Sequence, residues 1–235
     1  MSRMTAFGAG STLLMFLLMY AFRLRGIRKR TGIRLSAGEH LNAAGFAFLP
    51  AMAVWKAFEP YIHTESGAEV PSPLPTLPWA AQDGCFAPLR IEMAAAAIAF
   101  TALAVWLIAR ETDLPGNGDL LITVVCVWCG IRIVTESFRA EPYMAAVPLP
   151  MAVCLCVIGE LLCLLVWSIR RGKRTKTAVL TILDWAAVLA CETVIVLQDM
   201  AILSMGSEIA DLAARAGCAL LAMVLTLIAG KDSRG

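Results

Sequence analysis

The chain has 235 residues, of which 59% are hydrophobic and 16% are charged, and its mean hydropathy is +0.74. An average soluble domain carries roughly a quarter charged residues and about half apolar ones. The formal net charge of +2 gives no reason to expect a nucleic-acid partner. The apolar residues gather in blocks of roughly 18–22 residues, about the length that crosses a hydrocarbon core. The composition therefore favours an all-α, polytopic membrane protein over one or two soluble domains.

We expect about seven transmembrane helices that form one bundle in the lipid bilayer. The first block is short, but its strong positive charge comes after the apolar run and no small-residue cleavage site follows it. We therefore expect it to remain as a span and not to act as a signal peptide. The expected spans are residues 7–22, 41–58, 91–109, 119–138, 147–169, 178–197 and 212–229.

The basic residues indicate which ends of the spans face the cytoplasm. They cluster after the first span, at residues 23–34, and after the fifth, at residues 170–176. Arg110 follows the third span, and Lys231 and Arg234 follow the seventh. All of these segments fall on one side of the membrane when the spans alternate in direction. We therefore predict that the N-terminus is outside and the C-terminus is cytoplasmic.

The longest extracytoplasmic segment, about residues 59–90, is rich in proline. Proline fixes φ and removes a backbone donor, so we expect an ordered loop or an extended segment here and not a helix. The prolines of this segment are Pro60, Pro71, Pro73, Pro75, Pro78 and Pro88.

Charged residues stand on one face at the end of the fourth expected span. Arg132, Glu136 and Arg139 are spaced i, i+4, i+7, which places them on successive turns of one helix face. An arginine two turns inside the membrane needs a partner or a wet cavity, and Glu136 is the obvious partner of Arg132. The planar fork of arginine suits the oxygens of a phospholipid phosphate. The alternative is a buried Arg–Glu pair that only holds neighbouring helices together.

The run from Gly130 to Pro142, written G-x-R-x-x-x-E-x-x-R-x-x-P, resembles the late-helix signature of bacterial prolipoprotein diacylglyceryl transferases. The resemblance covers roughly residues 5–171 and includes Pro88 and Glu92, which are similar to the start of a family helix. It implies a transfer of the diacylglyceryl group from phosphatidylglycerol to the lipobox cysteine of a prolipoprotein. It also implies a location in the bacterial inner membrane, and partners that include the prolipoprotein signal peptide and the lipid bilayer.

The resemblance suggests roles for six residues. Arg132 and Lys56 are expected to hold the phosphate, and Glu136 to orient Arg132. Arg139, with Glu59 at the outer face, is expected to take part in substrate binding. The incoming thiol must lose a proton, and we expect Glu92 to accept it, with Glu59 as the other candidate. Residues 1–171 would then form the transferase-like core, and residues 172–235 an added C-terminal helical pair.

Two departures from the family pattern favour a second hypothesis, a non-catalytic relative that binds phospholipid or lipoprotein precursors. Phe7-Gly8-Ala9 stands where the family has His-Gly-Gly, and Lys56 stands where it has an arginine. Lysine keeps the charge but loses the bidentate fork.

A third hypothesis is a small transporter, because acidic residues at membrane depth often mark ion paths. The acids in question are Glu160, Asp184 and Glu192. We expect no cofactor and no metal site. Cys126 and Cys129 form a C-x-x-C pattern, but it lies in an apolar helix without a second pair or a nearby histidine, so we expect two packing residues.

Overall fold

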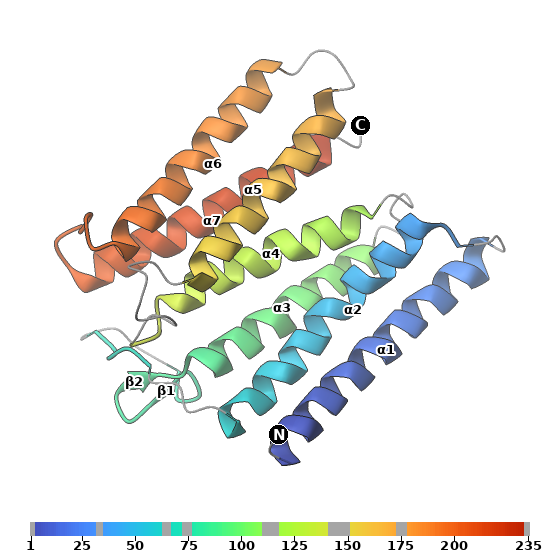
Figure 1. Ribbon diagram of the computed structural model, residues 1–235, viewed down its shortest axis with the longest axis horizontal. Helices are drawn as coiled ribbons and strands as arrows, with labels where there is room; N and C mark the ends of the chain where they lie inside the picture. The colour runs from blue at the N-terminus through green and yellow to red at the C-terminus, as the bar shows by residue number, and fades with distance from the viewer. Residues whose placement is uncertain are drawn as a thin grey trace. The chain divides into compact units, whose positions relative to one another are not determined.

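The computed structural model describes residues 3–31, 35–62, 67–71, 77–109, 118–140, 151–172 and 178–232. These residues form seven α-helices, one short 3₁₀ helix and one two-stranded hairpin (Figure 1). The elements are α1 (Arg3–Thr31), α2 (Ala37–Phe58), η1 (Glu59–Tyr61), β1 (Ala81–Gln82), β2 (Cys85–Phe86), α3 (Pro88–Ala109), α4 (Asp119–Glu136), α5 (Met151–Gly172), α6 (Ala178–Asp199) and α7 (Glu208–Asp232).

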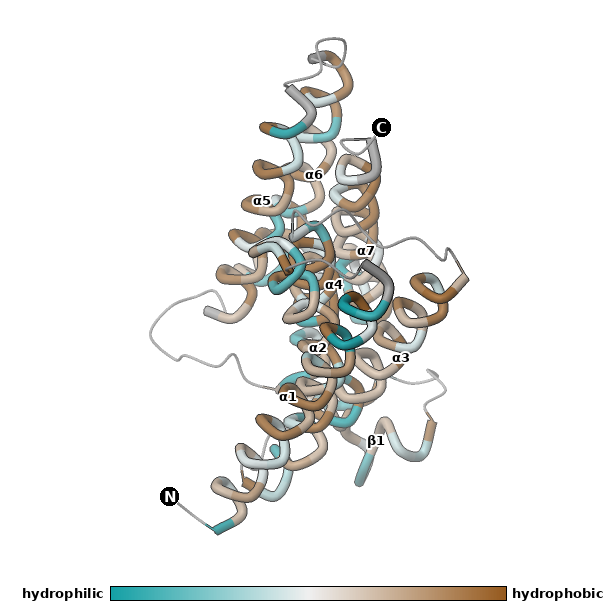
Figure 2. The backbone as a smooth tube through the Cα atoms, turned by 90° about the vertical axis from the view of Figure 1, so that its right-hand side faces the viewer, coloured by the Kyte–Doolittle hydropathy of each residue, from teal (hydrophilic) through white to brown (hydrophobic). Residues whose placement is uncertain are grey.

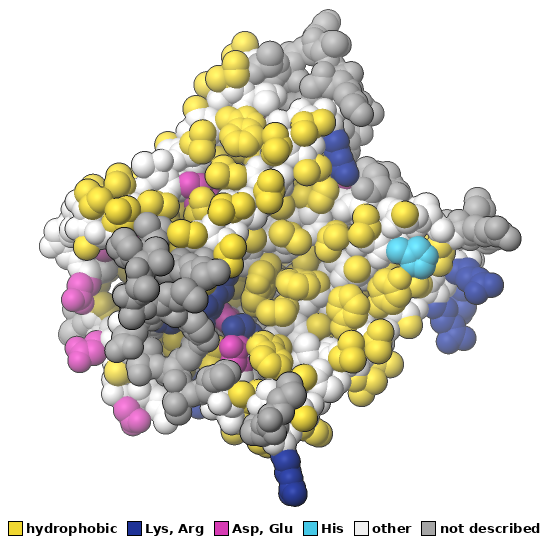
Figure 3. All heavy atoms as spheres, in the orientation of Figure 1, with side chains coloured by type: hydrophobic (Ala, Val, Ile, Leu, Met, Phe, Trp, Pro, Cys, Tyr) yellow, Lys and Arg dark blue, Asp and Glu magenta, His cyan; other side chains and the backbone are white. Residues whose placement is uncertain are grey.

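Six of these helices are long and apolar enough to cross a membrane, as a membrane protein requires. Helix α4 is not among the six; within 18 residues it carries Asp119, Arg132 and Glu136. Hydrophobic residues dominate the helices along the backbone (Figure 2), and hydrophobic side chains cover much of the face drawn in Figure 3. Such a large apolar surface would be unusual on a soluble monomer. The number of spans and their direction remain predictions.

Each expected span coincides with one helix, and α1 differs most from its expected bounds. It runs from Arg3 to Thr31, whereas the apolar block covers only residues 7–22. The helix extends into the basic segment because its backbone hydrogen bonds do not depend on side-chain polarity. The helix is therefore longer than the apolar block that it contains.

The chain divides into two compact units. The first contains residues 1–65 and 89–128, and the second contains residues 66–88 and 129–235. Helix α5 belongs to the second unit because it packs against α7 and α6. The expected division at residue 171 stays a prediction. It was based on the extent of the family resemblance and not on packing.

The first unit holds its helices together through close backbone contact and one long-range cap. A Cβ on Gly45 of α2 would lie 2.7 Å from the Cα of Leu121, so only glycine permits this approach. The Oδ1 of Asn42 accepts a hydrogen bond of 2.9 Å from the N–H of Leu120 and so satisfies a donor in the first turn of α4. The apolar core beside these contacts consists of Phe46, Leu49, Leu107, Leu120 and Val124.

In the second unit, the short hairpin anchors the chain that leaves α4. Asp83 and Gly84 have φ values of 53° and 80°, as a two-residue hairpin turn requires. Gly67 forms an antiparallel bridge with Arg139, and the N–H of Ala68 donates a 2.8 Å hydrogen bond to the carbonyl of Phe138. These contacts fix the backbone at Arg139 just beyond the end of the helix.

Candidate ionic site in the second unit

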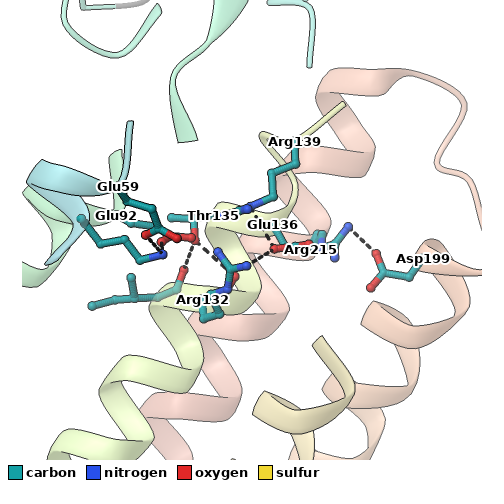
Figure 4. A network of polar contacts seen from close by, with 10 residues as sticks. Glu59, Glu92, Arg132, Thr135, Glu136, Arg139, Asp199 and Arg215 are labelled. Carbon is teal, nitrogen blue, oxygen red and sulfur yellow. Dashed lines mark hydrogen bonds and ion pairs between the residues drawn. The ribbon is translucent and has the colours of Figure 1, made fainter. Parts of the chain in front are cut away.

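The expected charged face exists at the end of α4. Arg132 Nη2 lies 3.0 Å from Glu136 Oε2, and Arg139 Nε lies 3.1 Å from the same oxygen (Figure 4). The side chains of Arg132, Glu136 and Arg139 are 12%, 2% and 3% exposed. One carboxylate therefore holds two guanidinium groups in nearly complete burial, and the expected pairing of Arg132 with Glu136 is confirmed.

A second ion pair belongs to the same unit. Arg215 on α7 pairs with Asp199 at the end of α6, and Glu136 adds an electrostatic attraction to Arg215. Figure 4 shows Glu136 between Arg132, Arg139 and Arg215. Sequence reasoning missed Asp199 and Arg215. The two residues lie on different helices, so no spacing along one helix face indicates that they pair.

A cavity of about 340 Å³ lies in this unit, and Arg215 contributes to its wall. Its lining combines apolar side chains with carboxylate, amide, hydroxyl and guanidinium groups. This volume and this mixture are typical of small-molecule sites, which are mostly apolar with a few polar groups that orient the ligand. The lining residues are Ala68, Glu69, Pro71, Phe86, Ser137, Gln198, Leu203, Glu208, Asp211, Leu212 and Arg215.

The other three predicted site residues form an ionic cluster in the first unit. Lys56 Nζ lies 2.7 Å from Glu59 Oε2 and 2.7 Å from Glu92 Oε2. The side chains of Lys56 and Glu59 are nearly buried, and Glu92 is fully buried. The ammonium of Lys56 is thus held between two carboxylates, which compete with any phosphate for it.

The six predicted residues therefore fall into two sets of three. Arg132, Glu136 and Arg139 are brought together in the second unit, and Lys56, Glu59 and Glu92 in the first. Glu141 and Pro142, which belong to the resemblance, lie outside the described residues.

Of the two histidines, the structure describes His40. His40 Nδ1 lies 2.6 Å from the hydroxyl oxygen of Tyr20, in a part of the chain predicted to be cytoplasmic. His63 lies outside the described residues.

The acids considered for transport do not line the cavity. Glu160 is fully buried and Glu192 is 3% exposed, and the two side chains interact across α5 and α6. A Cβ on Gly130 would lie 3.3 Å from Glu160 Oε1, so α4 packs closely over this carboxyl group. Among the described residues, no group of three or more histidine, cysteine or acidic side chains is arranged to hold a metal ion.

Fold and site together define a helical protein with apolar spans suited to a membrane and with ionic clusters buried inside its units. Comparisons with protein-family models, with curated proteins and with solved structures found no match to this chain.

Proposed function

We propose that this protein binds the phosphate of phosphatidylglycerol at the outer leaflet and transfers the diacylglyceryl group to the lipobox cysteine of a prolipoprotein. The observation that carries this proposal is the gathering of Arg132, Arg139 and Arg215 around Glu136. The resemblance of residues 130–142 to the transferase signature supplies the reaction.

The physical support is the unfavourable free energy of burying arginine in an apolar protein. Several kcal/mol are lost when a charge leaves water, and the loss is recovered only through well-placed partners. Here Asp199 holds Arg215, while Glu136 serves both Arg132 and Arg139 and also attracts Arg215. A surplus of guanidinium over carboxylate among these five residues favours an anionic ligand such as a phosphate.

The transfer would proceed by displacement at carbon. The cysteine sulfur attacks the carbon of the diacylglyceryl group that carries the phosphate, so a C–S bond forms while the bond from that carbon to the phosphate oxygen breaks. The electron pair of that bond leaves with glycerol 1-phosphate, and the guanidinium groups stabilise the charge that develops on it. The thiol proton passes to a carboxylate. Glu92, with Glu59 as the other candidate, remains the predicted acceptor.

A non-catalytic lipid-binding relative is the second candidate, and the cluster around Lys56 favours it. The family expectation places a cation here to hold phosphate, but Lys56 is held by Glu59 and Glu92 at 2.7 Å each. His40, the histidine that the structure describes, is engaged with Tyr20. Such a relative would bind phosphatidylglycerol through Arg132 and would release no glycerol phosphate.

Lipid binding that depends on Arg132 tests the feature shared by both candidates. Native mass spectrometry of the purified protein would count bound phosphatidylglycerol against diacylglycerol, which has the same tails and no phosphate. Arg132→Gln should weaken phosphatidylglycerol binding about tenfold, because it removes a charge-assisted, bidentate contact. Arg132→Lys should bind with intermediate strength, because it keeps the charge without the fork.

Arg90→Gln is the matched control, because Arg90 is an exposed arginine predicted on the same side of the membrane. It should bind as the unmodified protein does. Equal binding of the two lipids, or phosphatidylglycerol binding that Arg132→Gln and Arg132→Lys leave unchanged, would end the proposal.

A further inference from the structure

The cavity of the second unit carries charges that the transfer reaction does not use. Glu69 and Glu208 are exposed carboxylates on its wall, and neither belongs to the charged face of α4. Arg215 contributes the guanidinium of the lining. The cavity therefore offers both signs of charge, which distinguishes it from a simple acidic patch.

Helix geometry arranges these charges in depth. Glu208 is the first residue of α7, and Arg215 lies seven residues further along the same helix. Seven residues make about two turns, so the two side chains share a face and their Cα atoms differ by about 10 Å along the axis. The carboxylate thus stands at the beginning of the helix, and the guanidinium stands about two turns into it.

The guanidinium of Arg215 brings a positive charge to the wall of the cavity. One nitrogen of Arg215 pairs with Asp199, while Nε and Nη2 are buried and have no hydrogen-bond partner among the described residues. An anionic oxygen that enters the cavity is attracted by the positive charge that Arg215 brings to its wall. The Arg215 side chain is 13% exposed, so the group is mostly but not wholly enclosed.

The third carboxylate of the lining is already in use. Asp211 accepts hydrogen bonds of 2.6 Å from the N–H of Met205 and 3.0 Å from the hydroxyl of Ser204. It therefore holds the connection between α6 and α7 in place. This leaves Glu69 and Glu208 as the carboxylates that can meet a ligand cation.

We propose that this cavity binds a phosphoethanolamine group, with its phosphate on Arg215 and its ammonium between Glu69 and Glu208. A zwitterion matches a guanidinium two turns into α7, a carboxylate at the start of that helix and the carboxylate of Glu69 on the same cavity wall, whereas phosphatidylglycerol has no ammonium for these carboxylates. Phe86, Leu203 and Leu212 give the apolar wall that a glycerol backbone or the first methylenes of a lipid would cover. The proposal shares Arg215 with the cluster around Glu136, but its test depends on Glu69 and Glu208, which the transfer reaction does not use.

Titration calorimetry on the purified full-length protein tests this assignment. One arm compares water-soluble glycerophosphoethanolamine with glycerophosphoglycerol, and the other compares the dihexanoyl lipids that carry the same two headgroups. The ethanolamine compound should bind at least about fivefold more tightly than its glycerol counterpart, as two ammonium–carboxylate contacts of modest strength permit. Preference in the first arm identifies the free headgroup as sufficient, and preference in the second arm alone identifies a lipid ligand.

The double variant Glu69→Gln with Glu208→Gln should abolish this preference. Both side chains are exposed, so the variant is expected to fold. Asp83→Asn is the matched control, because Asp83 is an exposed acid of the same unit outside the cavity, and asparagine accepts its positive φ. The proposal is overturned if both headgroups bind equally in both arms, or if the double variant keeps the preference.

Discussion

Glu136 is the residue on which the charged face of α4 depends, because two arginines of the same chain segment share its Oε2 atom. Helix spacing places Arg132 one turn before it, and the hairpin contact fixes the backbone at Arg139 just after it. A carboxylate shared in this way balances only one of the two positive charges. We propose that the remaining positive charge attracts the phosphate of the lipid.

The pairs within one helix were predictable, and the pairs between helices were not. Arg132 with Glu136 follows from an i, i+4 spacing, whereas Asp199 with Arg215 requires knowing how α6 packs on α7. Glu92 is a similar case, since it meets Lys56 from another helix. Sequence gives neighbours along a helix face but not the rotation of one helix against the next.

The ion pair between Asp199 and Arg215 predicts a large loss of stability when one partner is removed. Asp199→Asn leaves Arg215 mostly buried without its nearest counter-charge, which should lower the free energy of unfolding by about 3 kcal/mol. The double variant Asp199→Asn with Arg215→Gln removes both charges. It should lower the free energy of unfolding by less than the sum of the two single changes. Denaturation in detergent, followed by circular dichroism, measures this coupling. Strict additivity would show that the two groups do not interact.

At the scale of elements, the apolar blocks located all seven helices, and six of these are long and apolar enough to cross a membrane. The hairpin of β1 and β2 was not predicted, although Asp83-Gly84 is the strongest short hairpin signal. The flanking strands have only two residues each and lack an alternating pattern. A strand so short is specified by its tertiary contacts and not by its own sequence.

We expect the helix contact at Gly45 to be the one in the first unit that is most sensitive to an added methyl group. Gly45→Ala would place a Cβ against the backbone of Leu121, which cannot move as a flexible side chain would, so the thermal midpoint should fall. The matched control is Gly26→Ala in α1, where nothing lies within 4 Å of the new Cβ. That change should leave the midpoint unchanged or raise it slightly, because alanine is the better helix former. Equal effects of both changes would contradict the close approach.

At the scale of the whole molecule, composition was sufficient to predict an all-α protein with membrane-length apolar helices. It was not sufficient to predict how the chain divides. Helix α5 packs with α6 and α7, whereas the family resemblance groups it with the residues that precede it. Packing partners depend on which helix faces complement one another. In lipid these faces are not distinguished by hydrophobicity, since the surrounding tails are equally apolar.

The direction of the chain in the membrane is a prediction from its basic segments. Alkaline phosphatase, which is active only outside the cytoplasm, should be inactive when fused after residue 176 and active when fused after residue 206. The physical reason is that the basic cluster at residues 170–176 disfavours translocation. The reverse pattern of activity would place the charged end of α4 on the cytoplasmic side and would remove the outer-leaflet assignment.

The most direct test of the central claim is a transfer assay with defined components. Purified protein in phosphatidylglycerol vesicles is given a peptide that carries a lipobox cysteine, and the peptide mass is followed together with released glycerol 1-phosphate. The proposal predicts that the peptide gains one diacylglyceryl group on its cysteine and that Arg132→Gln slows this gain about 100-fold or more, as removal of an electrostatic contact to the departing group would. An unmodified peptide under conditions where the protein binds phosphatidylglycerol would contradict transfer and leave the lipid-binding relative.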